Sequence, residues 1–170
     1  MKLAFLIALS MILITGVMVF LLPSERTGEV RANLPVPQED VYRLVTDLRS
    51  QSWRSTVKEL KILDAKDGAE VWMEIPKKGP EMKFKTVVKV KPERFEIALI
   101  DNPGLEAHWV GTFKATSPTT TEIHFVERVH LKSWLAKALS YLFFDVQASV
   151  DQYVEDLKTE LTRAKEIRHG

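Results

Sequence analysis

The feature that most constrains the fold of this chain is a long stretch in which apolar and polar side chains alternate. The alternation runs from Val57 to Leu131, and turn-forming residues interrupt it at strand-length intervals. Consecutive segments of period two with short connections are typical of antiparallel hairpins. The predicted strands cover residues 57–65, 69–75, 82–91, 94–101, 106–115 and 120–130. Together they predict one curved sheet with one solvated face.

The segments on either side of this stretch predict a further strand and two helices. Thr27–Leu34 reads as a short first strand, and apolar residues spaced by three and four predict a helix over Gln38–Leu48. Ser133 is a suitable N-cap, and a continuous apolar stripe follows from Leu135 to Leu161. Since neither Gly nor Pro occurs between Ser133 and Gly170, the sequence predicts a single long amphipathic helix there.

The amino-terminal segment has the composition of a membrane anchor. Leu3–Leu22 contains no charged residue, and about 20 residues at a rise of 1.5 Å match a hydrocarbon core of roughly 30 Å. The run ends at Pro23 without the small-residue pattern of a signal-peptide cleavage site. We therefore expect an anchor over residues 1–23 and one soluble domain over residues 24–170. The short tail with Lys2 favours a single-pass protein whose domain is extracytoplasmic.

Composition and motifs exclude several function classes. A net charge of +1 gives little attraction for nucleic acid, and the absence of cysteine removes thiolate chemistry. The four histidines lack metal-site spacing, and neither a G-x-S-x-G motif nor a glycine-rich phosphate loop occurs. We expect His108, His124 and His130 on the solvated face. The sequence thus predicts no metal, no cofactor and no assigned catalytic residue.

The order of elements resembles the START-like (helix-grip, SRPBCC) superfamily, which includes the polyketide cyclases and dehydrases. The local sequence is similar at Lys91-Pro92-Glu93-Arg94-Phe95, at His108–Phe113 and at Thr119–Ile123. The resemblance covers roughly residues 26–168. It implies an α+β fold in which a curved antiparallel sheet of about seven strands wraps around the long C-terminal helix. It also implies a cavity between sheet and helix that holds a hydrophobic ligand.

The expected function is therefore non-catalytic binding of a lipid or another hydrophobic small molecule at a membrane. The side chains expected to line the cavity are mostly apolar, as in small-molecule sites generally. They are Met73, Met82, Phe84, Phe95, Trp109, Phe113, Phe125, Glu127, Leu139, Phe143 and Val146. The simpler interpretation of the apolar members is a packed core. In that case the domain would be a membrane interaction module without a ligand.

Glu127 is the polar exception in this set. Strict alternation places it on the face of Phe125 and Val129, where a carboxylate needs a partner or a raised pKa. It is either a polar handle for the ligand or the general acid of a polyketide cyclase-like enzyme, with Arg94 as a possible partner. The simpler alternatives are that a bulge exposes Glu127 and that Arg94 is a solvated strand end.

Two surface features remain open at the level of sequence. Leu135–Phe144 is apolar on more than one helical face, which fits a cavity gate, a membrane-dipping lip, a partner surface or burial on two sides. The alternating row Lys83, Lys85, Lys89 and Lys91 is expected on the solvated face. These lysines either bind anionic lipid headgroups or keep the sheet surface soluble.

Overall fold

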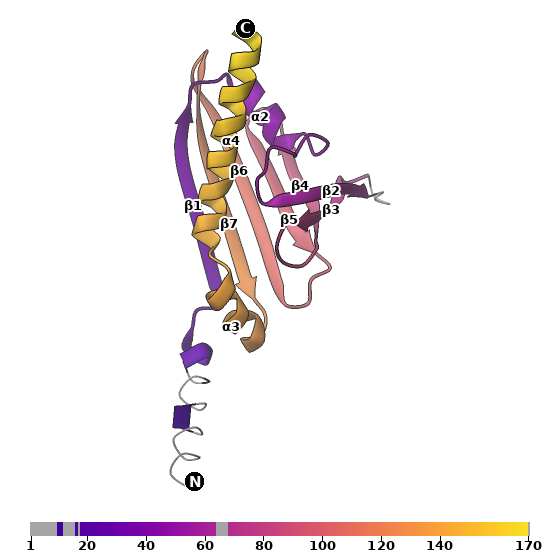
Figure 1. The fold of residues 1–170 in the computed structure, drawn as a ribbon, viewed down its shortest axis with the longest axis vertical. Helices are drawn as coiled ribbons and strands as arrows, with labels where there is room; N and C mark the ends of the chain where they lie inside the picture. The colour runs from indigo at the N-terminus through magenta and orange to yellow at the C-terminus, as the bar shows by residue number, and fades with distance from the viewer. Residues whose placement is uncertain (1–9, 12–15, 17, 64–67, 170) are drawn as a thin grey trace.

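The computed structural model describes residues 10–11, 16, 18–63 and 68–169. Seven antiparallel strands form one sheet in the order β1-β7-β6-β5-β4-β3-β2, and helices lie on one face of it (Figure 1). The strands are β1 Glu25–Leu34, β2 Val57–Leu63, β3 Val71–Pro76, β4 Met82–Val90, β5 Arg94–Ile100, β6 Leu105–Ser117 and β7 Thr120–Leu131. The helices of the domain are α2 Gln38–Thr46, α3 Trp134–Phe143 and α4 Val146–His169. The α+β helix-grip prediction is confirmed.

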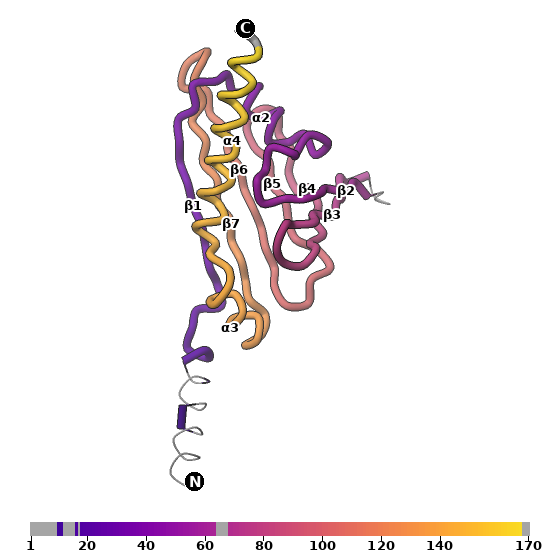
Figure 2. Tube along the Cα trace, in the orientation of Figure 1, coloured from indigo at the N-terminus to yellow at the C-terminus, as the bar shows by residue number. Residues whose placement is uncertain are grey.

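The sheet twists strongly along its width. In Figures 1 and 2, β2 and β3 run across the direction of β1 and β7, so the sheet encloses one concave face. Helix α4 lies against β1 and β7, and α2 contacts β6 and β7. The concave face is therefore covered by helices mainly over its β1–β7–β6 half.

The close contact of α4 with β1 depends on a glycine. A Cβ added at Gly28 would lie 2.6 Å from the backbone oxygen of Val146 and 3.0 Å from a side-chain carbon of Val150. Both valines are buried. The first turn of α4 can therefore reach the strand only because residue 28 has no side chain.

The alternation of β7 explains why its inward face forms the core. Ile123, Phe125 and Val129 are buried, whereas Arg128 and His130 are exposed. Cross-strand pairing carries the same face onto β6 and β1, because directly opposed residues share a face. The main core cluster then includes buried residues from α2 and α4 as well.

The prediction of a single C-terminal helix is wrong, because the chain breaks between α3 and α4. Phe144 is extended, and Asp145 Oδ1 accepts hydrogen bonds from the backbone nitrogens of Gln147 at 2.9 Å and Ala148 at 3.2 Å. Arg26 Nη1 donates to the carbonyl oxygens of Ser140 at 3.0 Å and Phe144 at 2.6 Å. Both helix ends are thus capped by side chains, which permits a break without Gly or Pro.

The predicted inward faces of β3 and of the end of β4 are also wrong. Met73 pairs with Lys61 and Lys83 on the convex face, so its neighbours Trp72 and Glu74 point inward. In β4 the register shifts between Thr86 and Val88. This irregularity reverses the alternation that follows. Lys89 is consequently opposite the inward-facing Phe95, and Val90 is exposed.

Most of the predicted anchor Leu3–Leu22 lies outside the described residues. Within the part that is described, no helix combines the length and the hydropathy needed to cross a bilayer.

Candidate functional site

Aromatic rings fill much of the space between the sheet and α4. The ring centroid of Trp109 lies 4.9 Å from that of Phe125 and 5.8 Å from that of Tyr153 on α4. Phe113 and Phe95 extend the cluster, at 5.6 Å from Phe125 and 6.3 Å from Trp109 respectively. These separations are those of packed aromatic pairs. The region where a cavity was predicted is thus largely packed.

Gly111 makes this ring arrangement possible. It is buried on β6, and a Cβ at this position would overlap the indole of Trp109 and approach Phe125 to 3.3 Å. The indole therefore lies over the glycine, on the concave face of its own strand.

A buried ion pair adjoins the aromatic cluster. Arg54, in the connection between α2 and β2, donates from Nη1 and Nη2 to the two carboxylate oxygens of Glu74 at 2.5 and 3.1 Å. The side chains are only 18% and 8% exposed. Trp72 Nε1 donates to Glu74 Oε1 at 3.3 Å, and the Arg54 guanidinium lies 5.3 Å from the Tyr153 ring centroid. The pair thus links β3, the α2–β2 connection and α4.

Glu127 lies on the same concave face, opposite Trp109 of β6 and Gly28 of β1. It is half-buried, and no described residue forms a hydrogen bond with its carboxylate. Burial raises the pKa of Glu127 to about 7; the positive charge of Arg54 opposes this rise and the negative charge of Glu74 adds to it. The carboxyl is therefore partly protonated near neutral pH and can either donate or accept a proton.

Other polar groups of this cluster also lack partners. The buried Trp53 Nε1 and Arg54 Nε have no hydrogen-bond partner among the described residues. Trp53 packs edge-on against Tyr153 at 5.2 Å. Burial raises the pKa of Tyr153 well above its usual value, so the phenol stays neutral and can donate a hydrogen bond. Trp53 Nε1 and Arg54 Nε are both free to bond to a hydrogen-bond acceptor that enters the cluster.

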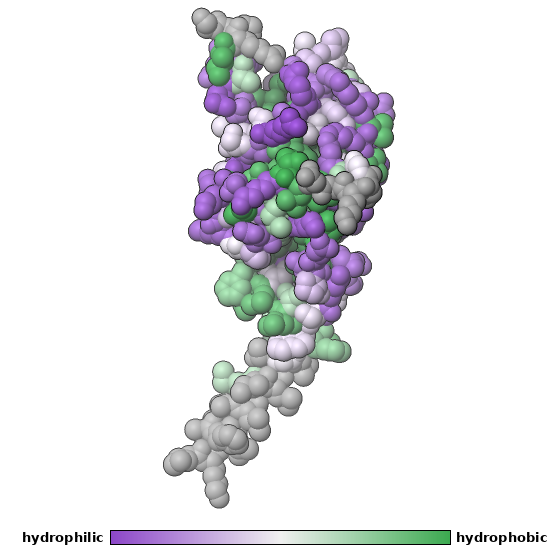
Figure 3. Space-filling view, turned by 90° about the vertical axis from the view of Figure 1, so that its right-hand side faces the viewer, coloured by the Kyte–Doolittle hydropathy of each residue, from purple (hydrophilic) through white to green (hydrophobic). Residues whose placement is uncertain are grey.

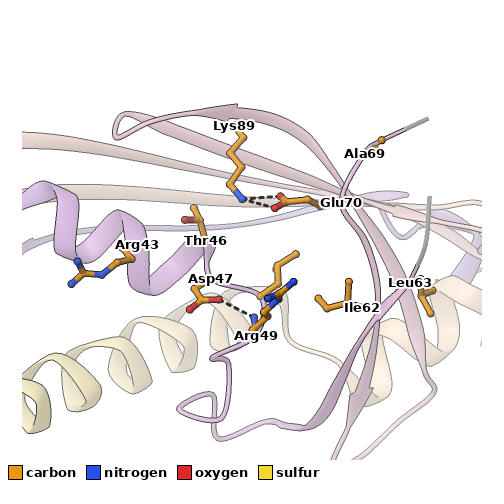
Figure 4. Close-up of a pocket in the computed structure, with 11 residues that line it drawn as sticks. Arg43, Thr46, Asp47, Arg49, Ile62, Leu63, Ala69, Glu70 and Lys89 are labelled. Atoms are coloured by element: carbon orange, nitrogen blue, oxygen red, sulfur yellow. Dashed lines mark hydrogen bonds and ion pairs between the residues drawn. The ribbon is translucent and has the colours of Figure 1, made fainter. Parts of the chain in front are cut away.

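A separate recess of about 560 Å³ opens beside the cluster (Figure 4). The end of α2 and the loop after it form one wall, and the end of β2, the residues just before β3 and Lys89 of β4 form the other. Its lining residues are Arg43, Thr46, Asp47, Leu48, Arg49, Ile62, Leu63, Gly68, Ala69, Glu70 and Lys89. Lys89 Nζ donates to both carboxylate oxygens of Glu70, at 2.7 and 2.8 Å. The volume suits a small molecule.

The recess and the cluster share strands. Ile62 in the recess is the cross-strand partner of Trp72, and Lys89 Nζ lies 5.7 Å from the ring centroid of Phe95. The recess therefore borders the inward face of the sheet at Ile62 and Lys89. A second pocket, of about 480 Å³, is lined by residues at the start of β1 and β6 and at the end of β5 and β7.

The structure separates the predicted lining residues into three groups. Those of the concave face are Met82, Phe84, Phe95, Trp109, Phe113, Phe125 and Glu127, together with Val146 at the start of α4. Met73 is on the convex face, and Leu139 and Phe143 are on α3 with 49% and 80% of their surface exposed. Contact of any of them with a ligand stays a prediction.

The histidines expected on the solvated face lie on the convex side of the sheet. His108 and His124 pair with acidic residues, Glu96 at 3.1 Å and Glu29 at 2.7 Å, on the convex side. Arg94 forms an ion pair with Glu96 there and does not reach Glu127. Among the described residues, no group of three or more acidic or histidine side chains is arranged to hold a metal ion.

Sequence reasoning missed Arg54, Glu74 and Tyr153. Arg54 lies in a polar connection that has no periodicity. In β3, alternation favours the more apolar set Val71, Met73 and Ile75 as the inward face, which would place Glu74 outward. The available signal was Trp72, which is too large to leave in water at the end of a sheet. Tyr153 fits the apolar stripe of the C-terminal helix, so its position in the sequence does not set it apart.

Comparison with known proteins agrees with this geometry. The profile of the family described as "Polyketide cyclase / dehydrase and lipid transport" matches residues 34–150, more than half of the chain. The chain belongs to this family. The match spans α2, the strands from β2 to β7, α3 and the start of α4. No curated protein matches the sequence.

Solved structures share the fold of this family member at low sequence identity. TTHA0849 from Thermus thermophilus is 15% identical with a TM-score of 0.67, covering 82% of this chain and 99% of its own. The Zhui aromatase/cyclase from Streptomyces sp. R1128 is 11% identical with a TM-score of 0.66, covering 82% and 94%. A START superfamily protein from Mycobacterium smegmatis is 15% identical with a TM-score of 0.61, covering 81% and 98%.

Proposed function

We propose that this family member binds a hydrophobic small molecule through its concave face while tethered to a membrane. The observation that carries the proposal is the unpaired Glu127 carboxyl beside the buried aromatic cluster and the Arg54–Glu74 ion pair. Ligand sites combine apolar walls with a few polar groups in this manner. The unpaired donors Trp53 Nε1 and Arg54 Nε favour a ligand with a carbonyl or hydroxyl oxygen at one end.

The recess is the proposed entrance. It adjoins the aromatic face through Ile62 and Lys89, and its wall includes three cationic side chains, Arg43, Arg49 and Lys89. The tether in this proposal is the uncharged run Leu3–Leu22, which is long enough to cross a bilayer. A tethered domain would sample ligands that dissolve in lipid rather than in water.

Native mass spectrometry of the detergent-extracted full chain tests the binding proposal. We expect a co-purifying small molecule in the wild type and in Glu127→Gln, since an amide keeps a hydrogen-bond donor. Retention should fall in Glu127→Leu. The control is Glu122→Leu, on the convex face of the same strand, which should keep the ligand. Ligand-free protein in every sample contradicts the proposal.

A second function is favoured by one observation, the pKa of about 7 at Glu127. A carboxyl that titrates near neutral pH is suited to general acid–base catalysis. In this alternative the ligand is a substrate, Glu127 transfers the proton, and Arg54 stabilises negative charge. Glu127→Gln separates the two functions: a catalyst keeps its ligand but no longer converts it, whereas a binding protein shows no conversion in either form.

A further inference from the structure

Helix α3 is an apolar element that the domain does not bury. None of its residues is buried, and Lys137 is its only charged residue. The large apolar side chains exposed on it and at its end are Trp134, Leu135, Leu139, Leu142, Phe143 and Phe144. Apolar side chains gather at the lower end of the molecule in Figure 3, where Figure 1 places α3. A contiguous apolar surface of this kind marks an interaction site.

Side-chain hydrogen bonds hold α3 against the end of the uncharged amino-terminal run. Lys137 Nζ donates to the carbonyl oxygen of Leu22 at 3.0 Å, and the Tyr141 hydroxyl donates to that of Pro23 at 3.3 Å. Arg26 Nη1 donates to Ser140 Oγ at 2.8 Å, and its guanidinium lies 4.5 Å from the Tyr141 ring centroid. The helix is therefore fixed at the position where the run Leu3–Leu22 meets the domain.

We infer that α3 lies in the surface of a lipid bilayer, with its apolar side chains among the upper acyl chains. The inference rests on the tether in the proposed function: a run that enters the bilayer ends at Leu22, which brings α3 to the membrane surface. The composition suits that depth, because Trp134 and Tyr141 have apolar rings with one polar edge. The domain is then docked on the membrane by α3, with one end of its sheet facing the lipid.

A matched pair of labelled variants tests the docking. Since the chain has no cysteine, Phe143→Cys and Ile167→Cys each create a single labelling site. Both side chains are exposed, at 80% and 72%, and neither belongs to the core. Residue 143 ends α3, whereas residue 167 lies near the far end of α4. Each full-length variant carries an environment-sensitive fluorophore and is reconstituted into vesicles of phosphatidylcholine and phosphatidylglycerol.

We expect blue-shifted emission at position 143, together with quenching by lipids that carry a nitroxide on the acyl chain. Position 167 should show neither effect. Co-flotation of the protein with a label at position 143 that remains in water overturns the docking but leaves the tether intact. Failure to co-float overturns the tether and the docking together. Disulfide-linked dimers of unlabelled Phe143→Cys would assign the surface to a second copy and also overturn the inference.

Discussion

Glu127 has a protonation equilibrium in the folded protein that differs from that of the unfolded chain. Burial raises its pKa from 4.5 to about 7. Between these two values the folded protein keeps the proton and the unfolded chain loses it. The contribution of Glu127 to stability is therefore unfavourable above pH 7 and disappears below pH 4.5.

Replacing Glu127 by Gln should remove this pH dependence. At roughly 1.4 kcal/mol per pKa unit, the rise in the pKa of Glu127 corresponds to about 3 kcal/mol. Because Glu127 is only half-buried, solvent screening reduces this value. We expect the variant to be more stable than wild type by about 2 kcal/mol at pH 8 and equal to it below pH 4.5. The measurement is the free energy of unfolding by urea in a non-ionic detergent, taken as the difference between the two proteins at each pH. A difference that does not change with pH would falsify the assigned environment of Glu127.

A second prediction at the residue scale concerns the stability contributed by the Arg54–Glu74 ion pair. Arg54→Met leaves the Glu74 carboxylate buried without its cation, which should lower the free energy of unfolding by about 3 to 5 kcal/mol. Adding Glu74→Gln should recover much of the loss, since the amide oxygen still accepts from Trp72 Nε1. The control is Arg43→Met, whose exposed pair with Asp40 should contribute less than about 1 kcal/mol. Equal losses in the single and double variants would contradict this assignment.

At the scale of elements, the contact between β1 and α4 determines how the helix is seated. We expect Gly28→Ala to lower the unfolding free energy by about 1 to 3 kcal/mol, because the added Cβ meets the backbone of Val146. Gly104→Ala is the matched control: the nearest atom to its Cβ is a side-chain oxygen of Asn102 at 3.6 Å, an ordinary contact. Thermal unfolding followed by circular dichroism compares the two, and similar melting temperatures would show that α4 can shift without cost.

The break before α4 depends on a local side-chain cap, Asp145. Asp145 accepts two backbone N–H groups of the first turn, so Asp145→Ala should cost about 1 kcal/mol. Asp145→Asn should cost less, since its amide oxygen can still cap the helix. Urea denaturation of the three proteins checks the order. A variant Asp145→Ala as stable as wild type would mean that Arg26 alone maintains the break.

At the scale of the whole molecule, Leu22 and α3 meet at one end of the domain, and the carboxyl end of α4 lies at the other (Figure 1). In the proposed docking, the α3 end of the domain faces lipid and the opposite end faces water. The recess opens on the side, between the end of α2 and β2–β4. A ligand would thus enter beside the sheet rather than through the docked end.

The tether itself is tested by placing a charge in the uncharged run. Leu13→Arg, near the centre of Leu3–Leu22, should cost about 2.5 to 3.5 kcal/mol of insertion free energy. We expect wild type to remain in the membrane fraction after alkaline carbonate extraction and the variant to be partly released. Ser24→Arg, just beyond the run, is the control and should behave as wild type. Extraction of the wild type would remove the tether from the proposed function.

The sequence by itself determined the strands, their order along the chain and α2, because alternation and turn residues act over short distances. The helix-grip arrangement of these elements was implied by the family resemblance. It also identified Glu127 as a carboxyl on the inward face of β7, since that strand has no irregularity before residue 131. These features depend on neighbours along the chain, and so local pattern is enough to find them.

Only the tertiary structure decided which residues surround Glu127 and where the hollow lies. The register shift in β4 moved the side chain of Lys89 to the inward face, and the pairing of β3 placed Glu74 on that face as well. The hydrogen bonds of Arg26 and Asp145 separated α3 from α4. Each outcome depends on residues distant in sequence or on one inserted position that no periodicity records. Alternation was enough to predict that Trp109 and the other interior side chains point inward. It could not predict that they pack together and fill the space, because packing depends on the volumes of side chains from several elements.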